Sequence, residues 1–397
     1  MIQRALRGDL TYFTWVGCLI ALCGLAVFVF VRQFTEGLGI TAMSRDVPWG
    51  FYIAQLTFLV GVAASAVMVV LPYYLHDYRT FRHMTILGES LAIPAVLLCP
   101  LFVVVDLGRP ERVLNLFLHP SPHSMLFWDT IALFGYLFLN IVIAFKTLEA
   151  ERNERPPARW VKILIYISIP WAISIHTVTA FLYSGLAARP FWFSAVLVPR
   201  FLASAFASGP ALLILLSLLV RRVSRFDPGL KAVHALARIV TYAALINLFL
   251  FGVEVFTILY SGVEHHKVHL QYLFVGLDGR IDAVVPFMWL SLGLGIAAIA
   301  LLIHPGTRGN LRMLAVACVF LFVSIWLDKG AGMLTGGLIP STTGRVTPYF
   351  PSGAEILMGI GLYAFGALVL TLLYKIAVSV KLETVGNAQN RRDTSDL

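Results

Sequence analysis

Several ionisable side chains stand inside long apolar stretches of this 397-residue chain. His176 and Glu254 lie within such stretches, and Glu89, Asp129 and Arg200 lie nearer their ends. An unpaired charge in an apolar medium is costly, so these residues are candidates for function. Carboxylates can take up or release protons. A histidine changes its charge near neutral pH and can hydrogen-bond a carbonyl oxygen, which suits proton exchange with a lipophilic carbonyl compound.

Helical spacing places some polar residues on shared faces. Asp129, Tyr136 and Asn140 follow one another at intervals of 7 and 4 residues, which aligns them along one side of a helix. His176 and Tyr183 are 7 residues apart and share a face in the same way. Such stripes form either hydrogen bonds that hold helices together or a route for protons. We favour bundle contacts for the neutral side chains and function for the carboxylates.

The histidines and cysteines argue against a bound metal centre. A membrane haem held by histidines needs two of them within spans, and of the 10 histidines only His176 lies well inside one. The four cysteines form no CxxC pair, which iron–sulfur and zinc sites commonly use. The sequence therefore predicts no haem, no iron–sulfur cluster and no metal in this chain.

The composition indicates that these residues lie in a lipid bilayer. Apolar residues make up 59% of the chain and charged residues 13%, against about 45–50% and about 25% in soluble domains. A soluble multidomain enzyme is excluded, and the net charge of +9 lacks the aromatic-interleaved basic runs of a nucleic-acid-binding protein. Runs of about 20 apolar residues must span as helices. We expect ten spans, near residues 11–31, 50–73, 84–105, 125–146, 161–185, 201–220, 236–262, 284–304, 311–328 and 353–378.

The distribution of basic residues predicts the orientation. With ten spans, 20 of the 30 Lys and Arg residues fall on the side that holds both termini. The basic side of a membrane protein is cytoplasmic, so both termini are expected in the cytoplasm and the longer connections 32–49, 106–124, 263–283 and 329–352 outside. Residues 1–382 then form one transmembrane domain, and residues 383–397 a polar, disordered cytoplasmic tail.

Five stretches carry a family resemblance that covers nearly the whole chain. The most specific begins Asp106-Leu-Gly-Arg-Pro-Glu-Arg and ends Phe127-Trp-Asp129. These stretches resemble the NrfD/PsrC family of quinone-interacting integral membrane subunits, and within it the ten-span branch that contains the DsrP subunits of DsrMKJOP complexes. They are residues 37–55, 106–129, 174–180, 199–210 and 328–340.

The resemblance implies a fold, a substrate and partners. The fold would be an all-α polytopic membrane protein with two four-helix bundles plus two extra helices. The substrate would be menaquinone or ubiquinone, bound near the periplasmic face of the cytoplasmic (inner) membrane. Electrons would pass to or from a periplasmic ferredoxin-like iron–sulfur subunit (DsrO-like), beside DsrM-, DsrK- and DsrJ-like subunits, in dissimilatory sulfur metabolism. The chain would be inactive alone. Proton translocation is compatible with this role, but neither it nor the direction of electron flow follows from the resemblance.

Within that framework the candidate residues receive roles. His176 and Asp129 would exchange protons with the quinone, and Asp106 with Arg109 would form a structural pair at a loop corner. The other roles are quinone binding by Tyr183, Arg200, Trp128 and Glu254, and a proton path through Glu89, Tyr136 and Asn140. The alternative is a secondary transporter or ion-conducting protein without a redox role. Transporters often show matched broken helices in two halves, and no such pair is evident here.

Overall fold

The chain forms an all-helical membrane protein in the computed structural model, which describes residues 8–63, 65–224, 226–277 and 279–395. In these ranges ten helices are long and apolar enough to cross a membrane. Apart from one isolated bridge between Leu277 and Arg280, the described residues form no β-structure. The predicted fold class and number of spans are confirmed.

The spans agree with the predicted positions to within a few residues at most ends. The second span is built from two helices, and the ninth continues through a π-helix, η4. The spans are α2 (Leu10–Glu36), α3 (Phe51–Ala63) with α4 (Val67–Leu75), α5 (Thr85–Asp106), α7 (Met125–Arg152), α8 (Arg159–Ser184), α9 (Leu197–Val223), α10 (Leu230–Ser261), α12 (Val284–Ile303), α14 (Leu311–Ile325) with η4 (Trp326–Gly332) and α15 (Met333–Leu338), and α16 (Gly353–Ser395).

Short helices lie in the connections between the spans. The connection after α5 holds two of them, and the others are single turns or a few turns long. They are η1 (Leu38–Ile40), η2 (Arg79–Phe81), η3 (Pro110–Leu114), α6 (Asn115–Leu118), α11 (Glu264–Phe274) and α13 (Pro305–Gly309).

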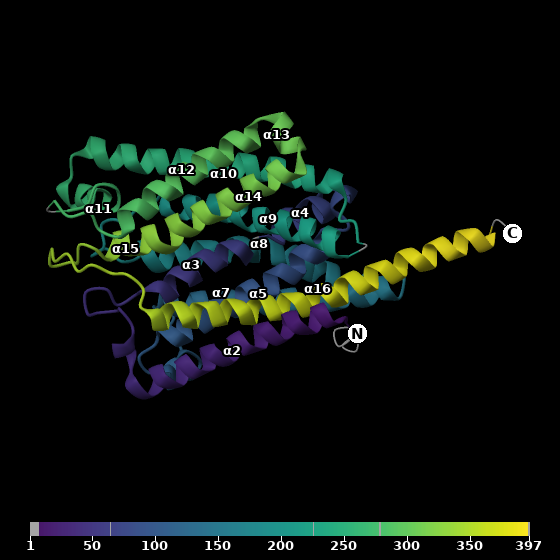
Figure 1. The fold of residues 1–397 in the computed structure, drawn as a ribbon, viewed down its shortest axis with the longest axis horizontal. Helices are drawn as coiled ribbons and strands as arrows, with labels where there is room; N and C mark the ends of the chain where they lie inside the picture. The colour runs from purple at the N-terminus through teal and green to yellow at the C-terminus, as the bar shows by residue number, and fades with distance from the viewer. Residues whose placement is uncertain (1–7, 64, 225, 278, 396–397) are drawn as a thin grey trace.

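The spans group as two four-helix bundles with two further helices (Figure 1). In the first bundle α5 packs on α3 and α7, and α8 packs on α7 and on α3 with α4. In the second, α9 packs on α10 and α14, and α12 packs on the same two helices. The extra pair, α2 and α16, lie along each other, and α16 packs on α5. This is the arrangement that the family resemblance implied.

Small residues allow the two bundles to approach closely. On α9, a Cβ added at Gly209 would lie 2.9 Å from the Gly61 carbonyl oxygen and 3.0 Å from the Ser65 backbone nitrogen of the first bundle. Only glycine fits at that separation, and Ala205 meets Gly61 one turn away. Close packing of small side chains stabilises helix contacts in membranes, where no hydrophobic driving force separates helix from lipid.

Two predicted boundaries need correction. The ninth span does not end at residue 328, because the helix continues to Leu338, and the following connection therefore begins at residue 339. Residues 330–338 are small or apolar, so nothing in them interrupts the helix. The backbone of the predicted tail, residues 383–397, continues α16 as far as Ser395 and extends beyond the other helices (Figure 1).

The connections divide between the two ends of the molecule. One end holds α11, α15 and the connection from α15 to α16. The opposite end holds the start of α2, the end of α4, α13 and the C-terminal part of α16 (Figure 1). Both ends of the described chain therefore lie on one side, as an even number of spans requires.

Candidate functional site

Asp129 and His176 lie in the interior of the first bundle. Asp129 is 1% exposed on α7, and the Thr179 hydroxyl of α8 donates a hydrogen bond to its Oδ1 at 2.6 Å. His176 stands one turn before Thr179 and is also 1% exposed. The two residues that were predicted to exchange protons are thus both buried in the first bundle, and Thr179, one turn after His176, links α8 to Asp129 of α7.

The His176 ring has one satisfied and one unsatisfied nitrogen. Nδ1 lies 2.6 Å from the carbonyl oxygen of Ala172. A carbonyl can only accept, so Nδ1 carries a proton and donates it, and Nε2 of the neutral ring is then an acceptor. Nε2 is buried and makes no hydrogen bond of normal geometry in the described structure, although the Val60 backbone lies close to the ring. Buried polar groups are nearly always paired, so an orphaned ring nitrogen marks a place for a ligand donor.

Tyr183 lies on α8, about two turns after His176, and faces the start of α9. Its hydroxyl hydrogen-bonds the Thr57 hydroxyl of α3. Its ring packs against Trp49, Trp192 and Phe201, with centroid separations of 5.7, 5.1 and 6.0 Å. Both Tyr183 and Trp192 are fully buried. The residues form an aromatic wall between the two bundles.

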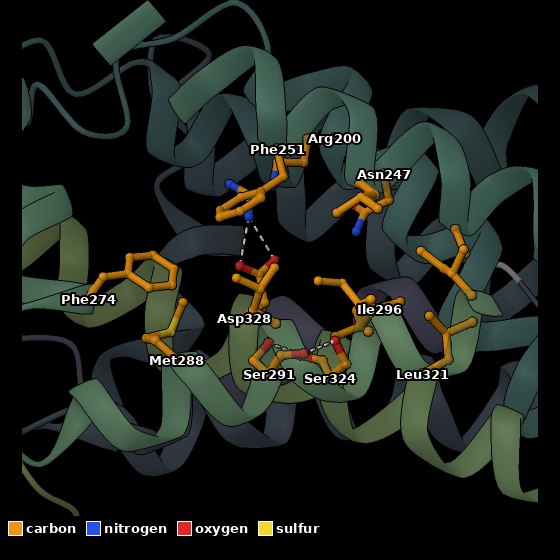
Figure 2. A pocket seen from close by; sticks show the side chains of 16 residues that line it. Arg200, Asn247, Phe251, Phe274, Met288, Ser291, Ile296, Leu321, Ser324 and Asp328 are labelled. Carbon is orange, nitrogen blue, oxygen red and sulfur yellow. Dashed lines mark hydrogen bonds and ion pairs between the residues drawn. The ribbon is translucent and has the colours of Figure 1, made fainter. Parts of the chain in front are cut away.

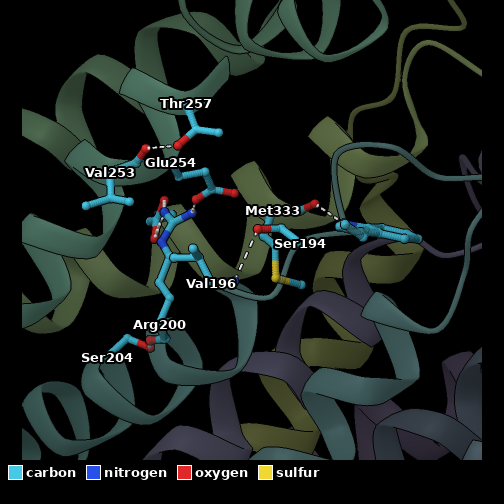
Figure 3. Close-up of polar contacts among 10 residues, drawn as sticks. Ser194, Val196, Arg200, Ser204, Val253, Glu254, Thr257 and Met333 are labelled. Carbon is cyan, nitrogen blue, oxygen red and sulfur yellow. Dashed lines mark hydrogen bonds and ion pairs between the residues drawn. The ribbon is translucent and has the colours of Figure 1, made fainter. Parts of the chain in front are cut away.

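Arg200 and Glu254 form a separate, charged group (Figures 2 and 3). One guanidinium nitrogen of Arg200 donates to Glu254 Oε2, and the other donates to both carboxylate oxygens of Asp328, at 2.7 and 2.8 Å. The Arg200 Cζ also lies 5.0 Å from the centre of the Phe251 ring. Arg200 and Glu254 are more than nine-tenths buried. Such pairing is what allows charged groups to remain in a low-dielectric interior.

Lys329 is a buried cation that the sequence analysis missed. It is 3% exposed in the π-helix η4, where Nζ donates to the Phe201 carbonyl oxygen at 3.2 Å and lies 3.9 Å from the centre of the Phe201 ring. Because Tyr183 also packs on that ring, Phe201 joins the aromatic wall to the charged group. π-Helical turns are frequent at functional sites. The sequence signal for a buried Lys329 was that the Asp328-Lys329 pair is followed by residues 330–338, which are small or apolar and continue the span.

Open space lies beside the charged group. A pocket of about 510 Å³, including its mouth, is bounded by α10, α12 and α14 and reaches Arg200 and Asp328 (Figure 2). Most of its lining is apolar. Its polar members are Asn247, whose Oδ1 is buried without a partner, and Ser291 and Ser324, which donate to each other's carbonyl oxygens. Of the predicted quinone-binding residues, Tyr183 lies in the first group, and Arg200 and Glu254 lie in the charged group.

The predicted proton path lies on buried faces of the first bundle. On α7, the Asn140 side chain donates to the Tyr136 carbonyl oxygen at 2.8 Å, and the Tyr136 hydroxyl is 3.5 Å from the Ala63 carbonyl oxygen. Glu89 of α5 is 2% exposed, and both its carboxylate oxygens lack a hydrogen-bond partner in the described structure. No hydrogen-bonded chain joins these side chains in the described residues.

Three predicted residues stand apart from both groups. Trp128 is 45% exposed, and its indole N–H donates to the Pro122 carbonyl oxygen at 2.8 Å. Asp106 has a buried Oδ1 without a partner, whereas Arg109 is exposed beside a surface pocket. Within the described residues no ion pair joins Asp106 to Arg109, so the structure does not form the predicted pair. Arg109 lies in the irregular backbone that leads into η3.

Relatives of the chain are membrane subunits of reductases. A putative dimethyl sulfoxide reductase membrane subunit of Halobacterium salinarum is 24% identical, over 89% of this chain and 88% of that protein. The Hdr-like menaquinol oxidoreductase integral membrane subunit of Archaeoglobus fulgidus is 22% identical, over 94% and 95%. A selenate reductase subunit of Mesobacillus selenatarsenatis is 23% identical, over 78% and 80%.

A family model covers most of the transmembrane region. The model described as polysulphide reductase, NrfD matches residues 39–329. This range contains seven complete spans and part of the ninth, both groups of candidate residues and most of the quoted loop motifs. The resemblance to this family found in the sequence is confirmed, and the chain belongs to the NrfD family of integral membrane proteins.

Proposed function

We propose that the chain is the quinone-reactive membrane subunit of a respiratory oxidoreductase complex. Membership of the NrfD family and the relative named as a menaquinol oxidoreductase subunit support this role. The observation that assigns this role to particular residues is the unpaired Nε2 of His176, one turn from the Thr179–Asp129 hydrogen bond. A transporter without a redox role has no specific observation in its favour.

His176 is suited to exchange a proton with the quinone head group. Menaquinone or ubiquinone supplies the two-electron, two-proton chemistry, and we place its head group at Nε2. The neutral ring accepts a hydrogen bond there, so it accepts the proton of a quinol hydroxyl. In the reverse direction the protonated ring donates to a quinone carbonyl. Proton transfer by a positioned group contributes about 10²–10⁴-fold in rate.

Asp129 and Tyr183 complete the proposed site. Asp129 receives the Thr179 hydrogen bond beside His176 and is the second proton-exchanging group. Tyr183 and its aromatic neighbours exclude water and provide flat apolar surfaces for a ring. Because His176 is 1% exposed, the surrounding side chains must move apart to admit the head group.

Arg200 and Glu254 serve this site as positioning residues. The guanidinium of Arg200 already donates to two carboxylates, so we assign it no direct bond to the quinone. The ion pairs tie α9 to α10 and to η4, and Phe201, the residue after Arg200, packs against Tyr183. Trp128, at the exposed start of α7, is assigned to the membrane surface near the entry of the site.

The proposal extends to proton movement and partners. Protons pass between Asp129 and the opposite face along Tyr136, Asn140 and Glu89. The connections at the α11 end face the periplasm and bind a ferredoxin-like iron–sulfur subunit of DsrO type, beside DsrM-, DsrK- and DsrJ-like subunits, because residues 37–55 and 328–340 resemble the DsrP branch. The complex then acts in dissimilatory sulfur metabolism, and this chain carries no haem, cluster or metal of its own.

Cysteine labelling tests the orientation. In a cysteine-free background, Ser44→Cys and Thr342→Cys lie in exposed positions at the α11 end. An impermeant thiol reagent should label both in intact cells whose periplasmic partner is absent, and should label Arg155→Cys only after lysis. The reverse pattern would place the proposed partner on the wrong side.

Turnover of the assembled complex tests the proposed role. The complex carrying His176→Ala is reconstituted in proteoliposomes, and quinol-linked electron transfer to its acceptor is measured. We expect a loss of about 10²-fold or more, with normal assembly. Normal turnover in this variant would contradict the placement of the quinone, and absence of quinol-linked turnover in the unaltered complex would contradict the function.

A further inference from the structure

A pocket lined by basic side chains lies at the end of the molecule that holds the start of α2 (Figure 1). Lys231, His234 and Arg238 reach it from the first turns of α10, and Arg308 reaches it from α13. It encloses about 830 Å³ together with its open mouth. The redox site described above uses none of these residues.

The cations in this pocket have no acidic partners among the described residues. None of the described residues that line it carries a carboxylate. In the described part of the chain, Lys231, Arg238 and Arg308 take part in no ion pair, although Arg308 donates to the Leu302 carbonyl oxygen at 3.3 Å. Three fixed positive charges around one hollow repel one another. An anion bound among them would remove that repulsion.

The pocket joins the two bundles. Tyr78 and Thr80, at the connection between α4 and α5, form the wall that the first bundle provides. The basic side chains all belong to the second bundle. A ligand that filled the pocket would therefore contact both bundles at the same membrane surface.

An apolar stripe runs from the pocket into the membrane. Lys231, Arg238, Tyr242 and Phe249 are separated by 7, 4 and 7 residues, so they lie on one face of α10. Tyr242 and Phe249 are each 68% exposed. At 1.5 Å per residue, Phe249 lies about 16 Å from Arg238 along the helix, which is close to half of the roughly 30 Å hydrocarbon core. The face thus presents cations at headgroup level and apolar surface over the depth of one leaflet.

We propose that this pocket is a binding site for the phosphate group of an anionic phospholipid, whose acyl chains lie along the exposed face of α10. Basic pockets between transmembrane helices recognise lipid phosphates by charge, and arginine donates hydrogen bonds to phosphate oxygens in a geometry that suits it. The stripe of exposed apolar side chains distinguishes a lipid from a free phosphate ion, which would gain nothing from Tyr242 or Phe249. The bound lipid stabilises the junction of the two bundles.

Lipid titration of the full-length chain tests the proposal. The delipidated protein in mild detergent is titrated with phosphatidylglycerol or phosphatidylcholine, and bound lipid is counted by native mass spectrometry while the melting temperature is recorded. Phosphatidylglycerol should bind and raise the melting temperature, and phosphatidylcholine should do neither. Each of Lys231→Gln, Arg238→Gln and Arg308→Gln should weaken binding about five-fold, as expected for one basic residue at a lipid surface.

Matched variants and soluble anions control the experiment. Arg155→Gln with Lys162→Gln removes two exposed basic charges on the same side but outside the pocket, and it should leave phosphatidylglycerol binding unchanged. Unweakened binding in the variant that lacks all three pocket cations would overturn the proposal. So would equal stabilisation by glycerol phosphate or inorganic phosphate at the same concentration, since the site would then hold a free anion.

Discussion

The Thr179 hydroxyl of α8 donates to the Asp129 carboxylate of α7 at 2.6 Å, deep in the first bundle. The bond joins two helices whose polar faces were predicted separately from helical spacing. Thr179 stands one turn after His176, whose Nε2 has no hydrogen-bond partner in the described structure. A carboxylate and an imidazole in the apolar interior of one bundle are groups that can exchange protons with a bound substrate.

Substitutions at Asp129 and Thr179 distinguish a role in proton exchange from a role in helix packing. Asp129→Asn keeps an oxygen that accepts the Thr179 hydrogen bond but cannot take up a proton, so we expect quinol-linked turnover to fall by about 10²–10⁴-fold. Thr179→Val removes only a hydrogen bond, which contributes about 0.6 kcal/mol in membrane bundles, and should cost far less turnover. Steady-state kinetics of the assembled complex distinguish the two.

Thr177→Val, on the exposed side of α8, is the control and should behave as the unaltered protein. Equal effects of Asp129→Asn and Thr179→Val would contradict the proton-exchange role.

Arg200 is expected to dominate the stability of the second bundle. Arg200→Gln leaves Glu254 and Asp328 as buried carboxylates without their cation, and breaking a buried pair in this way costs about 3–5 kcal/mol. Glu254→Gln leaves the bidentate contact between Arg200 and Asp328 intact and should cost less. Thermal unfolding of the purified chain in detergent measures both. A smaller effect for Arg200→Gln than for Glu254→Gln would contradict this assignment of the charged group.

Glu89 tests whether protons cross the first bundle. Glu89→Gln is nearly isosteric, and the carboxylate it replaces has no hydrogen bond to lose. Quinone affinity should therefore be unchanged, whereas turnover or proton uptake from the side of the termini should fall. The measurement is proton stoichiometry in proteoliposomes with a pH dye on that side. Glu149→Gln, at an exposed position, is the matched control. Normal turnover with normal stoichiometry in Glu89→Gln would leave Tyr136 and Asn140 as bundle contacts only.

His269 makes the docking of α11 sensitive to acid. This helix lies outside the spans. Burial lowers the pKa of His269, and the hydrogen bond between Nδ1 and the Ile339 carbonyl oxygen offsets only part of this effect. A histidine with a lowered pKa in the folded state stabilises the fold above its unfolded pKa of about 6.5. That stability is lost as the pH falls from about 6.5 towards the lowered value. Hydrogen exchange of α11 should accelerate over this interval, and His269→Gln should flatten the response while the exposed His265→Gln keeps it.

Much of the fold was predictable because the bilayer restricts the alternatives. Ten apolar runs, the shared face of Asp129, Tyr136 and Asn140, and the burial of His176 all follow from helical periodicity and the cost of exposed polar groups in lipid. The Arg200–Glu254–Asp328 contacts were not predictable, since spacing along a helix does not say which other helix it faces. Lys329 was missed because a charged pair at residues 328 and 329 looked like the end of a span, whereas contacts with Phe201 hold it inside.

Photolabelling with an azido-quinone tests the central claim most directly. The assembled complex is irradiated with the probe, and labelled peptides are mapped by mass spectrometry with and without excess menaquinone. We predict label on the α7 and α8 segments around Asp129 and His176, competed by menaquinone and lost in His176→Ala. Competed label confined to Asn247 and Ser291, in the pocket beside Arg200, would contradict the placement of the quinone at His176, and absence of competed label would contradict quinone binding by this chain.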